Sequence, residues 1–135
     1  MYQTQDDILD FDIGGTHKIT TTKKTLMKFE GSVLEAMFSG RHSLTTHNGR
    51  IFIDRDGSAF CNMITYLRTG LKPPFKDEDN MNRQMVYFRG RTITEEERMF
   101  YRELEYWQVP TPENYINIGD DDQLIEDAYE FNSFN

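Results

Sequence analysis

The spacing between apolar residues changes along this chain, and that change limits the folds it can adopt. Residues 8–13 alternate in character, Gly14-Gly15 follow as a turn, and a second extended run covers residues 17–21. This pattern predicts a β-hairpin over residues 8–21. Further on, helical spacing of i, i+3, i+4 and i+7 places four apolar residues on one stripe: Phe60, Met63, Ile64 and Leu67. The two periods in short segments indicate an α+β fold.

Capping residues and breakers mark the other elements. Thr22 can cap a short helix, and Ser32 and Thr94 each stand three residues before a glutamate, which is the spacing of a capping box. The sequence predicts three helices, over residues 23–29, from Ser32 to about Phe38 and from Thr94 to about Trp107. Between them it predicts a polar loop over 41–48 and a short strand near 49–53. A long connection over 71–93 is expected to contain a short strand at 85–88.

Length and charge predict one domain with an acidic extension. A chain of 135 residues fits a single core. Its net charge is −8, but residues 111–135 hold seven acids and no lysine or arginine, and residues 1–110 hold 16 acids and 15 bases. We therefore assign residues 1–110 to the domain and residues 111–135 to an acidic tail. A near-neutral body lacks the concentrated basic surface that nucleic acids require, so we expect no nucleic-acid partner.

The sequence shows no targeting or metal-binding motif. No stretch approaches the roughly 20 apolar residues of a membrane span, and the first ten residues lack the basic and apolar parts of a leader. Cys61 is the single cysteine, so an internal disulfide and a cysteine cluster for zinc are excluded. His42 and His47 have no zinc-finger spacing. We expect a cytoplasmic protein without membrane insertion, metal or cofactor.

Six short motifs follow one another along residues 8–109. They are Ile13-Gly14-Gly15-Thr16, Thr21-Thr22 with Thr25-Leu26, Met37-Phe38-Ser39-Gly40, Ile51 to Gly57, Leu67-Arg68-Thr69-Gly70, and Glu103 to Trp107. Their order and spacing resemble the BTB/POZ domain of the potassium-channel tetramerisation type, and especially the KCTD-like proteins. The connection over residues 71–93 is longer than the link usual in that family, and we treat it as an insertion.

The resemblance implies an oligomerising interaction module and no catalysis. Such domains have a small mixed sheet with a cluster of helices and assemble into rings, commonly of four or five subunits. They often act as adaptors for cullin-type E3 ubiquitin ligases. The resemblance also favours a role in the contact between subunits for four charged residues, Asp54, Arg55, Asp56 and Arg68. In a ring, the acidic face of one subunit meets the basic face of the next.

A cullin N-terminal domain is the partner that the resemblance suggests for a second surface. In BTB adaptors the cullin-facing side is formed by the loop after the second of these helices and by the closing helices. The corresponding residues here are Met37, Phe38, Ser39, Gly40, Tyr106 and Trp107. We expect one of the last two to pack in the core and the other to be exposed, where aromatic side chains commonly contact partners.

Two other functions are compatible with parts of the sequence. One is the cytosolic tetramerisation domain, or a partner, of a voltage-gated potassium channel, in which this fold matches subunits. The other is a small phosphate-binding hydrolase that would use Gly14-Gly15 and the loop around His42. A turn is the favoured interpretation of the glycines, because no Gly-Lys-Ser/Thr step leads from them into a helix.

The acidic tail supports two interpretations. Its acids, prolines and asparagines are typical of a solvated extension. Its many apolar residues instead favour a short amphipathic segment around residues 123–131 that docks on the ring or on a basic partner. The sequence does not choose between them.

Overall fold

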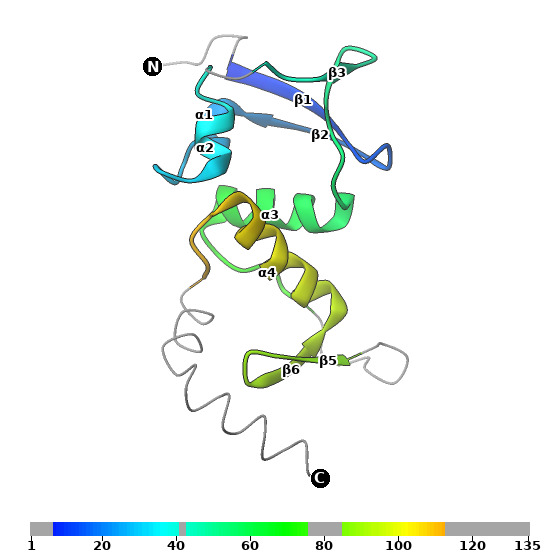
Figure 1. Cartoon of the computed structure of the whole chain (residues 1–135), viewed down its shortest axis with the longest axis vertical. Coiled ribbons are helices and arrows are strands. Elements are labelled where there is room, and N and C mark those ends of the chain that lie inside the picture. Colours follow the sequence, from blue (N-terminus) through cyan, green and yellow to red (C-terminus); the bar gives the residue numbers. More distant parts are fainter. Residues whose placement is uncertain (1–6, 41–42, 76–84, 113–135) are drawn as a thin grey trace.

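A computed structural model describes residues 7–40, 43–75 and 85–112 of the chain. These residues form a four-stranded sheet, a separate two-stranded sheet and four helices (Figure 1). The larger sheet has the strand order β2-β1-β4-β3, with β1 parallel to β4 and the other neighbours antiparallel. This arrangement confirms the predicted α+β class. His42 and the tail segment at residues 123–131 lie outside the described residues.

The first hairpin consists of β1 (Ile8–Ile13) and β2 (His17–Thr22). Its turn needs glycine at position 14, where φ is +61° and a Cβ atom would lie 2.6 Å from the carbonyl oxygen of Arg55. The amide of Gly14 donates to the carbonyl of Ile53 at 2.7 Å. The predicted hairpin is therefore confirmed, and its turn is packed against the connection that follows β4.

Helix α1 (Lys23–Leu26) is one turn shorter than the predicted helix over residues 23–29. The Thr22 hydroxyl caps it by accepting the amide of Thr25 at 3.1 Å. After α1, the Lys28 ammonium donates to the carbonyl of Leu67 at 3.0 Å, and the Phe29 ring stacks on Tyr66 with centroids 6.0 Å apart. Because Lys28 and Phe29 contact Leu67 and Tyr66 of a distant helix, the chain leaves the helical path after Leu26.

Helix α2 (Val33–Met37) begins at the predicted Ser32 cap, whose hydroxyl accepts the amide of Glu35 at 3.0 Å. The Ser32 amide donates to the carbonyl of Phe29 at 3.2 Å. The cap therefore forms, although the Ser32 amide is bonded to the preceding turn and not to the glutamate.

The predicted polar loop over residues 41–48 contains part of a second hairpin. Strand β3 (Thr46–His47) pairs with β4 (Arg50–Ile53) across the turn Asn48-Gly49. Both turn residues have positive φ, which is the requirement of a tight two-residue hairpin turn. The Asn-Gly dipeptide was the sequence signal for this hairpin.

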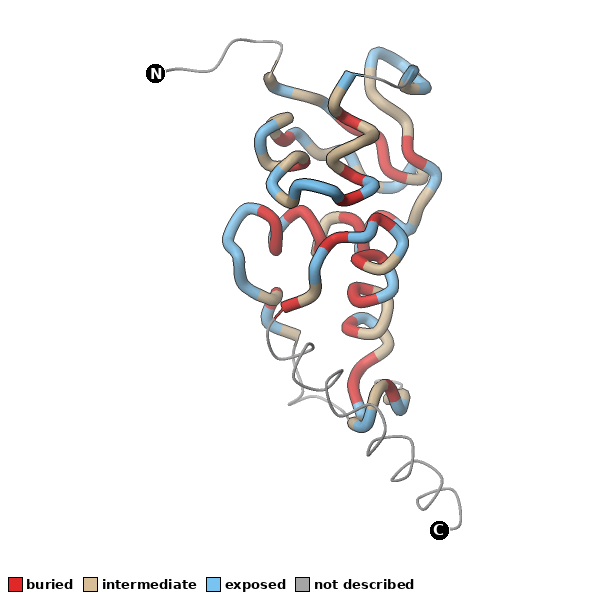
Figure 2. Tube along the Cα trace, turned by 60° about the vertical axis from the view of Figure 1, so that its left-hand side comes forward, coloured by how far each residue is buried: buried red, intermediate tan, exposed pale blue. Residues whose placement is uncertain are grey.

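Helix α3 (Gly57–Thr69) lies under the sheet and supplies the central stripe of the core. It begins at Gly57, because Asp56 is its cap, and it ends before Gly70, which has φ of +77°. The predicted stripe is confirmed. Its four side chains are at most 2% exposed, and they pack in one core with residues of β1, α2 and α4. Figure 2 shows buried residues concentrated along this middle layer.

Helix α4 (Glu95–Trp107) packs against α3 and closes the domain, and its extent matches the prediction. Before it, β5 (Met85–Phe88) and β6 (Arg91–Thr94) form the two-stranded sheet inside the predicted insertion. The strand at 85–88 was predicted, and β6 was not. In Figure 1 this hairpin lies at the end of the molecule opposite the larger sheet.

Candidate interaction surfaces

Helix α3 separates the acidic and basic residues that the sequence assigns to a subunit interface. Asp54 is exposed just before the helix, and Asp56 caps its first turn by accepting the amide of Ala59 at 2.9 Å. Arg68 is exposed near the other end and donates from its guanidinium to the carbonyl of Thr20 at 2.7 Å. With 13 residues in α3, roughly 20 Å separates these charges. They therefore cannot pair within one subunit.

Arg55, the fourth candidate interface residue, already has an acidic partner inside the domain. Its guanidinium donates to both carboxylate oxygens of Glu103, from Nη2 at 2.8 Å and from Nε at 3.2 Å. That hydrogen bond is the main cause that raises the pKa of Arg55. The guanidinium also lies 3.6 Å from the centre of the Tyr106 ring. Within the subunit, Arg55 therefore joins α4 to the segment before α3, and its role in a contact between subunits stays a prediction.

The same carboxylate fixes the end of α4. Glu103 has 3% of its side chain exposed and accepts the indole N–H of Trp107 at 2.9 Å. Trp107 is 4% exposed and packs edge-on against Phe60, whereas Tyr106 is 54% exposed. This confirms the expectation that one of the two aromatic side chains packs in the core and the other is exposed; a role of Trp107 in partner binding stays a prediction. Tyr106 is the member of the pair that a partner can reach.

The segment after α2 presents a smaller surface than the sequence suggested. Phe38 is 3% exposed and packs edge-on against Phe11, with ring centroids 5.6 Å apart. Its side chain is therefore buried in the core, and its role in partner binding stays a prediction. Met37 and Ser39 are half-buried and Gly40 is exposed. The accessible part of this surface consists of these three residues.

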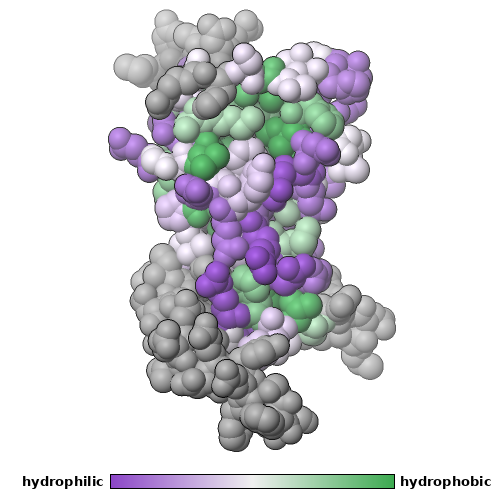
Figure 3. Space-filling model, viewed as in Figure 1, coloured by the Kyte–Doolittle hydropathy of each residue, from purple (hydrophilic) through white to green (hydrophobic). Residues whose placement is uncertain are grey.

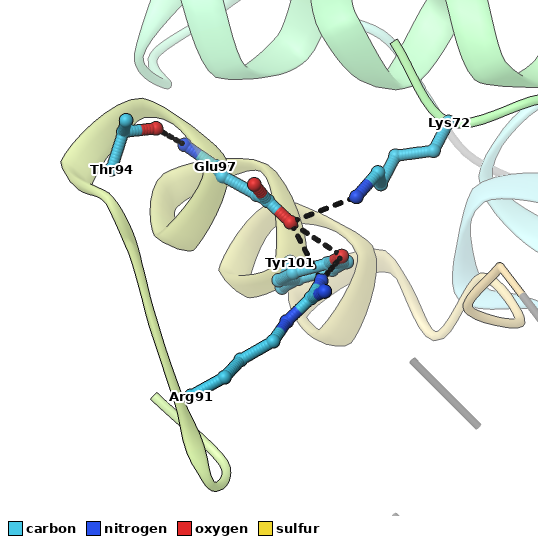
Figure 4. A network of polar contacts seen from close by, with 5 residues as sticks. All are labelled: Lys72, Arg91, Thr94, Glu97 and Tyr101. Carbon is cyan, nitrogen blue, oxygen red and sulfur yellow. Dashed lines mark hydrogen bonds and ion pairs between the residues drawn. The ribbon is translucent and has the colours of Figure 1, made fainter. Parts of the chain in front are cut away.

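A second buried glutamate, Glu97, joins three segments near the start of α4 (Figure 4). Its Oε2 atom accepts from Lys72 Nζ at 3.0 Å, from Arg91 Nη2 at 2.9 Å and from the Tyr101 hydroxyl at 2.8 Å. We call these four residues the Glu97 cluster. Burial, followed by the hydrogen bond and charge of Glu97, raises the pKa of Tyr101.

Sequence analysis missed the Glu97 cluster because Glu97 fitted a capping box. One half of that box forms, since the Thr94 hydroxyl accepts the Glu97 amide at 3.2 Å. The carboxylate points away from the cap and into the cluster. A glutamate on the apolar stripe of α4, between buried neighbours, was the available signal for an internal role.

The proposed phosphate site at Gly14-Gly15 lacks available donors. The amides of Gly14 and Thr16 donate to the carbonyls of Ile53 and Ile13, and the amide of Gly15 donates to the Asp12 carboxylate at 3.0 Å. A phosphate cradle needs such amides to point at the ligand. Within the described residues, no three histidine, cysteine or acidic side chains gather as a metal site would require.

The outer surface is mixed in character. Figure 3 shows hydrophilic residues over the middle of one face, at the level of α3 and α4 in Figure 1, with hydrophobic patches above and below. Among the described residues, no helix has the length and apolar character needed to cross a bilayer.

Sequence comparison agrees with the fold. Residues 9–115 match the family model of the BTB/POZ domain, and the chain belongs to this family, in its potassium-channel tetramerisation branch. It is 40% identical over 70 residues to FH protein interacting protein FIP2 of Arabidopsis thaliana, and 42% identical over 71 residues to BTB/POZ domain-containing protein KCTD14 of Homo sapiens. It is 33% identical over 86 residues to the potassium channel regulatory protein of Mus musculus.

These matches involve a limited part of each relative. They cover 50%, 52% and 61% of this chain, but 24%, 28% and 32% of the three relatives in the same order. The chain thus matches about a quarter to a third of the length of those proteins. Family membership defines it as a module for self-association and for binding other proteins.

Proposed function

We propose that this chain assembles head-to-tail into a ring of four or five copies, in which Asp54 and Asp56 of one subunit face Arg68 of the next. The observation that carries the proposal is the placement of exposed opposite charges at opposite ends of α3. A contact between unlike surfaces that is repeated by rotation closes a ring.

A charge-exchange experiment tests this pairing. Asp54→Arg and Arg68→Asp should each weaken assembly, because each places like charges opposite one another, and the double variant should assemble again. Lys24→Asp is the control, since Lys24 is an exposed cation on a different helix. Native mass spectrometry gives the subunit number. Failure of the double variant to recover assembly, or a wild-type monomer at tens of micromolar and low salt, would contradict the proposal.

Arg55 is left out of this experiment for a structural reason. Arg55→Glu would place a second carboxylate beside the buried Glu103, so it would damage the subunit itself. Salt gives an independent check, because surface pairs are screened over about 8 to 10 Å at ordinary ionic strength. Dissociation of the ring should increase between about 50 mM and 500 mM salt.

We further propose that the ring is a cytoplasmic, non-catalytic adaptor for a cullin-type E3 ubiquitin ligase. Family resemblance supports this role, and Met37, Ser39, Gly40 and Tyr106 supply accessible residues at the expected positions. The expected binding partner is a cullin N-terminal domain.

Calorimetry with a purified cullin N-terminal domain tests the adaptor role. Substitutions at the buried Phe38 or Trp107 would disturb folding. Met37→Asp and Tyr106→Ala are the test variants, because Met37 is half-buried and Tyr106 is exposed. Each should weaken the complex while the ring stays intact. An assembled ring that shows no binding at about 100 µM would contradict the adaptor role and favour the channel-partner alternative.

A further inference from the structure

The β5–β6 hairpin is a separate structural unit on the surface of α4. Its two strands pair with each other and form a sheet of their own, with a turn at Arg89-Gly90 in which both residues have positive φ. A two-stranded hairpin is marginally stable alone and gains order by packing on a helix. Here that helix is α4, which both strands contact.

Apolar packing attaches the hairpin through few side chains. Phe88 stacks on Tyr101 with ring planes 6° apart and centroids at 5.7 Å, and Ile93 is 3% exposed. Tyr87 and Thr92, which pair across the two strands, are exposed on the other side of the hairpin. Phe88 and Ile93 belong to the same apolar core that the larger sheet shares with α2, α3 and α4, and the half-buried Val86 packs against it. The hairpin is therefore joined to the domain core through Phe88 and Ile93.

Polar contacts tie the hairpin to α4 at two carboxylates. Arg89 Nη2 donates to Glu105 Oε2 at 2.7 Å, and the remaining contacts meet at one atom of Glu97. Glu97 Oε2 accepts from the segment after α3 through Lys72, from the hairpin through Arg91, and from α4 through Tyr101. The Glu97 side chain is 5% exposed. A buried carboxylate that loses its donors is costly, so contacts of this kind tend to form or break together.

We propose that the hairpin opens from α4 as one unit while the four-stranded sheet and α3 stay folded, and that the Glu97 carboxylate is the latch that sets how often it opens. Thr94 is the hinge, because β6 ends at this residue and α4 begins at the next. Opening uncovers the Phe88 and Tyr101 rings, so it creates an aromatic surface that the closed domain hides. This device does not depend on the proposed ring or on a cullin.

Hydrogen exchange at individual amides of the full chain tests the latch. In Glu97→Gln, amides of residues 85–94 should exchange about 10- to 100-fold faster, since one partner of a buried network is lost. Amides of β1 and α3 should keep their wild-type rates. Glu95→Gln is the matched control, because it is the same substitution on the same helix and its ion pair is with Arg98 of α4 itself.

A second variant keeps the test decisive if Glu97→Gln unfolds the whole domain. Arg91→Gln removes a donor that belongs to the hairpin and has 38% of its side chain exposed. It should accelerate exchange in residues 85–94 in the same selective way. Equal acceleration in the hairpin and in β1, or no acceleration in either variant, would overturn the proposal.

Discussion

Helix α4 buries one glutamate near each end, and different parts of the chain hold them. Glu103 is 3% exposed and binds Arg55 and Trp107, while Glu97 is 5% exposed and binds Lys72, Arg91 and Tyr101. Arg55 lies between β4 and α3. Lys72 and Arg91 come from the long connection between α3 and α4.

This comparison separates the contacts that join α4 to the larger sheet and α3 from the contacts that join it to the β5–β6 hairpin. Through Glu103, the C-terminal end of α4 is tied to the connection between the sheet and α3, where Gly14 also packs. Through Glu97, the N-terminal end is tied to the hairpin. We therefore expect changes around Glu103 to affect the whole domain and changes around Glu97 to act locally.

Glu103→Ala should give the largest effect. It leaves the Arg55 guanidinium and the Trp107 indole N–H without their acceptor, which should lower the free energy of unfolding by about 2 to 4 kcal/mol. The lower part of this range applies because the Arg55 side chain is 29% exposed, so water can solvate its charge after Glu103 is removed.

Urea denaturation measures this loss, and Glu105→Ala serves as the control on the same helix. Glu105 has 32% of its side chain exposed, so its removal should cost at most about 1 kcal/mol. Equal losses in the two variants would show that the buried pair adds nothing to the body of the domain.

Gly14→Ala should give the next effect, because it pushes on the backbone of Arg55. The new Cβ would lie 2.6 Å from that carbonyl oxygen, and the residue has φ of +61°. Gly15→Ala is matched to it, with φ of +78° but no atom within 4 Å of the added Cβ.

The backbone conformation alone should cost about 1 kcal/mol in Gly15→Ala, and the clash should raise the loss to about 2 kcal/mol or more in Gly14→Ala. Thermal unfolding of both variants measures the difference. If the two melting temperatures agree, the contact between the turn and Arg55 does not constrain the fold.

Tyr101 should give the smallest effect, and only in alkaline solution. Burial, together with Glu97, raises its pKa in the folded state above the usual value of 10.0. Below pH 10 the stabilising effect is complete. At higher pH the unfolded chain releases this proton first, so stability falls as the pH rises toward the raised pKa, by at most about 1.4 kcal/mol per pH unit.

Tyr101→Phe removes this titration, so its stability should fall less than that of the wild type between about pH 9 and about pH 11. Denaturation at several pH values provides the measurement. At the other end of α4, Trp107 occupies the corresponding place beside Glu103 and does not titrate. If the free energy of unfolding falls equally with pH in the wild type and in Tyr101→Phe, Tyr101 is not in the buried environment described.

Local patterns predicted most elements of this fold. The stripe on α3 and the caps at Thr22, Ser32 and Thr94 depend on residues a few positions apart, so a sequence displays them directly. The Asn48-Gly49 dipeptide is an equally local signal for the β3–β4 turn, where the polar character of residues 41–48 predicts a loop.

Side-chain partners were harder to predict because they are distant in sequence. Arg55 and Glu103 are 48 residues apart, and Lys72 and Glu97 are 25 apart. Nothing in the local pattern distinguishes a charge that will find an internal partner from one that will face another subunit. The same limit explains Phe38, whose burial depends on Phe11 in β1.

The hydrogen bond from Arg68 to Thr20 has a consequence for solubility. Strand β2 lies at the edge of its sheet, and an exposed edge can recruit strands from other molecules. The guanidinium occupies the Thr20 carbonyl that an incoming strand would need, at 2.7 Å. The Arg68 side chain thus hinders the addition of a further strand at the edge of β2. A neighbouring subunit that binds Arg68 and displaces it from Thr20 must therefore also cover this edge.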